Sequence, residues 1–118
     1  MKKSAFLLVV PALVFLFAKD ALCVGAIAVD DEIGESEPGY GFVTGAFSRE
    51  EAKRRALDEC GRSGNEDCRV VLWFESCGAY AASLTHYGVG WGSTKEQAKK
   101  RALDECGPGC VVKVAECE

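Results

Sequence analysis

The residues best suited to carry out chemistry in this 118-residue chain are the six cysteines that follow Cys23. They are Cys60, Cys68, Cys77, Cys106, Cys110 and Cys117. Cysteine thiolates can bind zinc, act as nucleophiles or pair as disulfides. Zinc is disfavoured because no Cys-x-x-Cys pair occurs and the chain has one histidine. An even number of cysteines in a small exported chain indicates three disulfides, with no thiol left for catalysis or for a metal.

Other groups that could do chemistry lack the partners that catalysis needs. Ser83 and His86 resemble a nucleophile and its base, but no third group nearby in sequence would orient the histidine. No acidic residue sits in an apolar stretch that would raise its pKa, as the acid of a glycosidase pair requires. The segment 88–93 lacks the glycine spacing and the lysine of a phosphate-binding loop. We therefore predict that the protein is not an enzyme and holds no cofactor.

The glycines of segment 87–92 alternate with larger residues, which is typical of a strand with two different faces. One face carries only glycine, so a helix can approach it closely. The other face carries Tyr87, Val89 and Trp91. Two interpretations of this second face remain open: an exposed aromatic surface for binding, or a small second core. Further aromatic residues could join either of them, namely Tyr40, Phe42, Tyr80 and Trp73.

An internal repeat indicates which elements position these residues. Segment 48–61 recurs without gaps as segment 94–107, with identical or similar residues at nearly every position. Such a repeat is typical of two copies of one supersecondary unit packed together. Each copy opens with a capping box, Ser48 with Glu51 and Thr94 with Gln97, and continues with alanine at helical spacing.

Short apolar or β-branched segments flank both helices and predict strands. They cover residues 25–29, 40–44, 69–75, 78–82, 87–92 and 111–115. We therefore predict an α+β domain over residues 24–118, made of two β-β-α-β units, 24–77 and 78–118. The two units would be related by a pseudo-twofold axis in a mostly antiparallel six-stranded arrangement, with both helices on one face.

The repeat also predicts how the cysteines pair, out of the fifteen patterns that six cysteines allow. Two of the pairs are local, because each joins a helix end to the start of the next strand. The third pair uses the cysteines that follow the last strand of each unit and would join the units. The pairing that agrees with the pseudo-twofold is Cys60–Cys68, Cys106–Cys110 and Cys77–Cys117.

The first 23 residues read as a secretory signal peptide. Lys2 and Lys3 precede an apolar stretch over 5–18 that is too short for a membrane span of about 20 residues. Cleavage after Ala18 and cleavage after Cys23 both fit. Removing residues 1–23 takes away three cations and one anion and moves the formal net charge from −4 to −6. An acidic surface is a poor match for nucleic acid or anionic lipid, so we expect neither nucleic-acid binding nor stable membrane insertion.

The combined pattern resembles a known family. It comprises a Gly-Ala-x-Ala strand at 25–28, Tyr-Gly strands, two Ala-Leu helices that end in cysteine, and the segment 68–79. It is similar to the exported bacterial domain catalogued as domain of unknown function 4189, over Val24 to Cys117. The resemblance implies a compartment and a repeated fold, but no catalytic residues. The acidic segment after Val29 departs from the family pattern.

These observations favour a periplasmic or secreted binding protein. The expected role is that of an inhibitor or immunity protein which neutralises a toxin or hydrolase acting on the cell envelope. The alternative is a secreted effector or host-interacting protein on the same scaffold. A basic protein partner, such as a cell-wall hydrolase, fits the acidic charge. The expected binding surface combines the acidic loop with two aromatic residues: Asp30, Asp31, Glu32, Glu35, Glu37, Tyr87 and Trp91.

Overall fold

The computed structural model describes residues 23–31 and 39–118, and it contains the two predicted β-β-α-β units. The first unit consists of β1 (Val24–Asp30), β2 (Gly39–Ala46), α2 (Arg49–Arg62) and β3 (Arg69–Phe74). The second consists of β4 (Cys77–Ala82), β5 (Tyr87–Gly92), α3 (Lys95–Cys106) and β6 (Val111–Cys117). The α+β class and the repeated layout are thereby confirmed.

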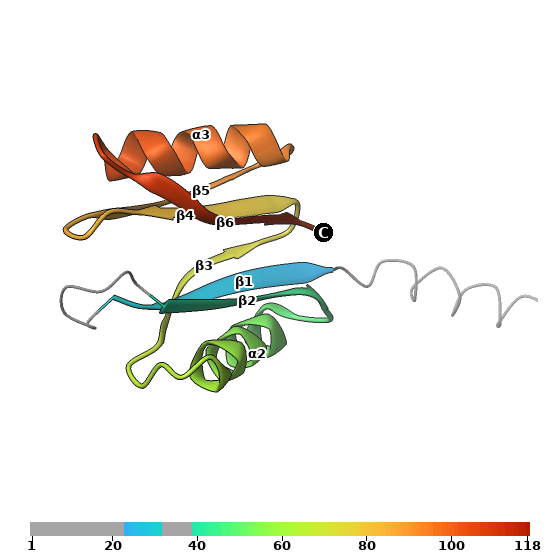
Figure 1. The fold of residues 1–118 in the computed structure, drawn as a ribbon. Coiled ribbons are helices and arrows are strands. Elements are labelled where there is room, and N and C mark those ends of the chain that lie inside the picture. The colour runs from blue at the N-terminus through green and yellow to red at the C-terminus, as the bar shows by residue number, and fades with distance from the viewer. Residues whose placement is uncertain (1–22, 32–38) are drawn as a thin grey trace, which may run out of the picture.

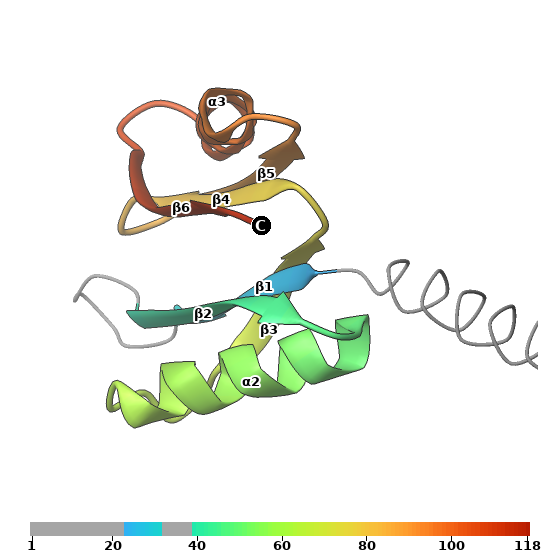
Figure 2. The same cartoon turned by 90° about the vertical axis from the view of Figure 1, so that its right-hand side faces the viewer.

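The six strands form two sheets, each with its own helix. β1 is the central strand of a β2-β1-β3 sheet and β4 is the central strand of a β5-β4-β6 sheet, and all pairs are antiparallel. The sheets face each other, with α2 outside the first and α3 outside the second (Figures 1 and 2). The expectation that both helices share one face is therefore wrong. Each sheet has two apolar faces, and one of them is buried by its own helix and the other by the opposite sheet.

Three apolar clusters fill the spaces between these four layers. Alternation along the central strands directs one set of side chains to the helix and the next set to the other sheet. Under α2 lie Ala26 and Ala28 of β1 with the helix alanines Ala52 and Ala56. The corresponding cluster under α3 is again mostly alanine and cysteine. The layer between the sheets holds the larger side chains: Ile27, Val29, Leu72, Phe74, Tyr80 and Val114.

Both helices begin at the predicted caps. The Ser48 hydroxyl accepts a hydrogen bond from the Glu51 N–H, and the Thr94 hydroxyl accepts one from the Gln97 N–H, each at 3.1 Å. The Glu51 and Gln97 side chains differ from the expected box in their partners. They accept from the N–H groups that precede the caps, those of Phe47 and Ser93. The outcome is the same, because backbone donors at the helix entry are satisfied.

The glycine face of β5 lies against α3, as its alternation predicts. A Cβ on Gly88 would stand 2.5 Å from both the Ala102 carbonyl oxygen and the Cys106 nitrogen. A Cβ on Gly90 would stand 2.5 Å from the Ala102 nitrogen. Such distances leave no room for any side chain. The absence of side chains on this face lets the helix backbone pack directly on the strand.

Three disulfides are present, and they join the pairs expected from the repeat: Cys60–Cys68, Cys77–Cys117 and Cys106–Cys110. The first and last link a helix end to the following strand. The middle one differs from expectation in what it connects. β3 ends at Phe74 and the turn falls at 75–76, so Cys77 already belongs to β4. Cys77–Cys117 therefore links neighbouring strands of the second sheet and does not join the two units.

Candidate functional site

The face of each sheet that no helix covers is buried mainly by the other sheet. Tyr80 of β4 is fully buried there, next to Ile27 and Val29 of β1. Of the aromatic residues considered above, Tyr80 thus belongs to a second core and Tyr40 packs against it, whereas the other four stay exposed. Trp73 does not belong to this layer, because it lies on the α2 side of β3 with the Arg49 guanidinium 4.5 Å from its ring centroid. The aromatic residues of this set that remain exposed lie on edge strands of the two facing sheets.

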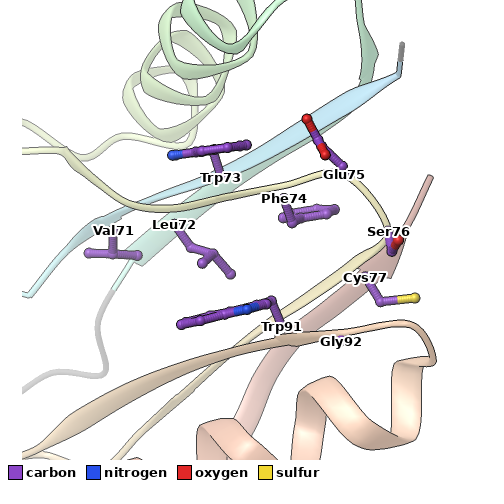
Figure 3. A pocket seen from close by; sticks show the side chains of 9 residues that line it. All are labelled: Val71, Leu72, Trp73, Phe74, Glu75, Ser76, Cys77, Trp91 and Gly92. Atoms are coloured by element: carbon purple, nitrogen blue, oxygen red, sulfur yellow. The ribbon is translucent and has the colours of Figure 1, made fainter.

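One such edge forms an apolar groove between β3 and β5. The groove has a volume of about 580 Å³ and is lined by residues 71–77, Trp91 and Gly92. Leu72 and Phe74 of β3 point toward Trp91 of β5, while Trp73 lies on the other side of its strand (Figure 3). Leu72 and Phe74 are buried, whereas Trp91 is 56% exposed. A large aromatic ring is therefore held by a rigid strand at the mouth of an apolar hollow.

A polar cluster lies between the other ends of the same two strands. The Arg69 guanidinium of β3 is 5.1 Å from the ring centroid of Tyr87, on β5, and its Nη1 is 3.5 Å from the tyrosine hydroxyl. Its Nη2 donates to the Asp31 carboxylate at 2.8 Å. The contact with Tyr87, followed by the pairing with Asp31, raises the pKa of Arg69 above its ordinary value. Arg69 thus ties the two edge strands to the residue that follows β1.

The hydroxyl of Tyr80 is buried near this cluster. It has no hydrogen-bond partner within the described ranges 23–31 and 39–118. The Tyr80 and Tyr87 ring centroids are 6.1 Å apart. Burial, and then the negative charge of Asp31, raise the pKa of Tyr80 to about 12. This phenol therefore stays neutral throughout the physiological range.

The structure separates the residues proposed for the acidic part of the surface. Asp30 is buried, and its carboxylate accepts hydrogen bonds from the Glu66 and Asp67 N–H groups at 3.2 Å each. Its role is to hold the loop that carries Cys68, so its place on an exposed binding surface is wrong. Asp31 is partly exposed and paired with Arg69. The remaining members lie outside the described residues: Glu32, Glu35 and Glu37.

The aromatic part of that surface lies on one strand face, as alternation predicts, but it is spread along the strand. Tyr87 is 40% exposed and sits in the Arg69 cluster, and Trp91 lies four residues further on at the groove. At about 3.3 Å per residue, this spacing places them roughly 13 Å apart. Trp91 and Tyr87 thus mark opposite ends of the β3–β5 edge.

The serine and histidine of the β4–β5 turn have structural roles. The Ser83 hydroxyl accepts from the backbone N–H groups of Thr85 and His86, at 3.3 and 3.0 Å. The histidine ring pairs with the Thr85 hydroxyl at 2.8 Å through Nδ1. The hydroxyl of Ser83 thus stabilises the turn. Within the described part of the chain, no three histidine, cysteine or acidic side chains gather as a metal site would require.

Comparison with protein-family models shows to which family the chain belongs. The model of the domain of unknown function DUF4189 matches residues 24–117. The chain belongs to this family. No curated protein and no solved structure matches it. No helix in the described ranges of this DUF4189 domain is long and apolar enough to cross a membrane. Its three disulfides are compatible with a periplasmic or secreted protein.

Sequence reasoning did not identify the β3 wall of the groove or the role of Arg69. The run Val70 to Phe74 is continuously apolar, which indicates a strand buried on both faces but does not show which side chains border an opening. In the sequence, Arg69 is one of several charged residues and stands at the start of a predicted strand. Its contact with Tyr87 depends on the packing of the two sheets, which the spacing of residues within one strand cannot show.

Proposed function

We propose that this DUF4189 domain is an exported, non-enzymatic binding protein that takes hold of a protein partner at the groove between β3 and β5. The function we favour is that of an inhibitor or immunity protein acting on a toxin or hydrolase of the cell envelope. The observation that carries the proposal is Trp91, half-exposed on a rigid strand beside an apolar hollow of about 580 Å³. Tryptophan in such positions is enriched among the residues that dominate binding energy.

The scaffold around the groove supports binding with little loss of entropy. β3 and β4 are joined by a short turn, and Cys77, which lines the groove, is fixed to Cys117 by a disulfide. At the far end, Arg69 connects β3 to Tyr87 of β5. A preformed groove loses less conformational freedom on association than a flexible one, so more of the contact energy remains as affinity.

The charge of the domain favours a basic partner. The chain without residues 1–23 carries a formal charge of −6, and Glu75 borders the groove. Opposite charges accelerate encounter, and this effect weakens as salt rises. Export of the domain, which the amino-terminal segment and the disulfides favour, would place it where cell-wall hydrolases act.

The test is affinity capture from a periplasmic extract with the tagged domain, followed by measurement of binding to the captured protein. Trp91→Ala should accelerate dissociation and weaken affinity by roughly 30-fold or more, the loss typical of a hot-spot residue. Phe47→Ala is the matched control, because Phe47 is 79% exposed in the turn before α2 and is not among the residues that line the groove. If the two variants bind alike, or if no protein is captured, the proposal is wrong.

A further inference from the structure

Three exposed aromatic residues lie on the edge strands β3 and β5, and two of them are each covered by an arginine of the same chain. The Arg49 guanidinium lies 4.5 Å from the ring centroid of Trp73, and the Arg69 guanidinium lies 5.1 Å from that of Tyr87. A cation is attracted to the face of an aromatic ring because the ring's quadrupole is negative there. Guanidinium stacking is therefore how this fold covers Trp73 and Tyr87.

Trp91 is the third of these residues and the most exposed of them, and its ring has no such partner. No arginine or lysine within residues 23–31 and 39–118 lies over the indole. Arg101 of α3 does reach Trp91, but its guanidinium donates to the carbonyl oxygen at 2.7 Å. Its side chain leaves the helix at the glycine face of β5, because a Cβ on Gly90 would stand 2.8 Å from the Arg101 Cβ. Alternation directs the Trp91 side chain to the opposite face, so Arg101 does not cover the ring.

The groove beside Trp91 combines an apolar floor with a single charge. Leu72 and Phe74 form the floor, since they point toward Trp91 from β3 (Figure 3). Glu75 is the only charged residue among the described residues that line the groove. It is exposed and forms no ion pair with any described residue. The groove therefore offers apolar surface, an aromatic face and one negative charge.

We propose that the groove receives an arginine side chain of the protein partner, with the guanidinium over the Trp91 ring and the methylene groups on Leu72 and Phe74. The inference rests on the proposed function, because it names the side chain that the partner inserts at the same groove. Arginine can bury its apolar stem while its charged end stays near water. Its flat guanidinium stacks on aromatic faces, and arginine is itself enriched among the residues that dominate binding energy. The formal charge of −6 without residues 1–23 favours the same occupant.

Other side chains match the groove less completely. A leucine or phenylalanine would cover the apolar floor but leave the charge of Glu75 without a counterpart. An acidic side chain would be repelled by that charge. A lysine carries the right charge, but its ammonium is compact and strongly hydrated, so it gives up more on leaving water for a ring face. The rings of Trp73 and Tyr87 both have arginine as their partner, which favours arginine at Trp91 as well.

The test is NMR titration of the oxidised domain with blocked amino acids, which measures binding at the groove without a captured partner. The probe is N-acetyl-arginine methylamide. The chain contains two tryptophans, so each indole N–H signal reports on one ring. The Trp91 signal should shift and saturate, whereas the Trp73 signal should stay in place because Arg49 already covers that ring. The isosteric but uncharged citrulline derivative should bind at least ~3-fold more weakly, the loss expected for a cation–π contact at an exposed site. A leucine derivative that binds as tightly as the arginine derivative would overturn the proposal.

Two variants separate the contributions of the ring and the carboxylate, with binding followed at the Gly92 amide. Trp91→Leu keeps an apolar side chain but removes the aromatic face, so affinity for the arginine derivative should fall at least ~3-fold while affinity for the leucine derivative stays unchanged. Glu75→Gln should weaken the arginine derivative by roughly 2-fold, an effect that high salt removes. Glu66→Gln is the matched control, because it makes the same charge change at an exposed residue that does not line the groove. Equal binding of the arginine derivative by the parent and Trp91→Leu would refute the stacking.

A last measurement separates this inference from the proposed function. The arginines of a protein captured from periplasmic extract are blocked with phenylglyoxal, which should abolish its binding to the domain. If the blocked protein still binds, and Trp91→Ala still weakens that binding, the arginine is wrong and the proposed function stands. Failure of the proposed function has a different result, namely equal binding of the captured protein by Trp91→Ala and Phe47→Ala. Tighter binding of free L-arginine than of the blocked derivative would assign the groove to a small molecule and overturn docking of a partner side chain.

Discussion

Replacing Gly90 with alanine should destabilise the domain sharply, although alanine is ordinarily at least as favourable as glycine in a strand. The new Cβ would lie 2.5 Å from the Ala102 nitrogen, where ordinary contact begins at 3.4 Å. The obstacle is helix backbone, which cannot rotate away as a flexible side chain would. α3 must therefore move outward by about 1 Å, which loosens the close packing of Ala98 and Ala102. Overpacking of this kind costs about 3 kcal/mol at the upper end of its usual range.

The assay is urea unfolding followed by circular dichroism, with the disulfides intact. A loss of about 3 kcal/mol is a large part of the 5–15 kcal/mol that a domain typically has, so the midpoint should fall visibly. Gly61→Ala is the matched control. Nothing lies within 4 Å of its added Cβ, and in helix α2 alanine should gain about 1 kcal/mol over glycine. If Gly90→Ala unfolds at the parent's midpoint, direct packing of α3 on the β5 backbone is refuted.

Three further predictions follow from single features. Because the pKa of Tyr80 is raised from 10.0 to about 12, the folded state holds this proton more tightly, so stability should fall as pH rises from 10 toward 12. Tyr80→Phe should remove this loss of stability at alkaline pH and add about 1 kcal/mol to the free energy of unfolding at neutral pH. Urea unfolding at neutral and at alkaline pH measures both effects. If the variant loses as much stability at alkaline pH as the parent, the prediction is wrong. Asp30→Ala should cost about 2 kcal/mol, because the Glu66 and Asp67 N–H groups lose a charged acceptor; an unchanged urea midpoint would show that they do not depend on it. Thiol labelling of the denatured, unreduced domain should find no reactive thiol among the six bridged cysteines, and two or more labelled sites would exclude the bridges.

The repeat made much of the architecture predictable. Helix starts at Ser48 and Thr94, buried alanine stripes and the glycine face of β5 all follow from local spacing. These features depend on contacts within one unit, where residues close in sequence are also close in space. The cysteine pairing followed for the same reason, since two of the three bridges span eight and four residues.

The packing of one unit on the other could not be predicted from these patterns. A strand that is apolar on both faces shows that each face is covered, but it does not show whether a helix or a second sheet covers it. Only the tertiary structure places Tyr80 between the sheets and Trp91 at their open edge. The burial of Asp30 has the same cause, because its partners include two backbone donors 36 and 37 residues away.

The sequence by itself thus determined the repeated unit, its helix caps and its bridges, because each depends on short-range spacing along the chain. Tertiary structure decided which residues are accessible. It placed Tyr80 in a core between the sheets and left Tyr87 and Trp91 exposed. It also placed Arg101 and Glu105 of α3 on the outer backbone of β5. Two nearly identical helix sequences differ in the partners of equivalent side chains, and only the folded neighbours of each helix set that choice.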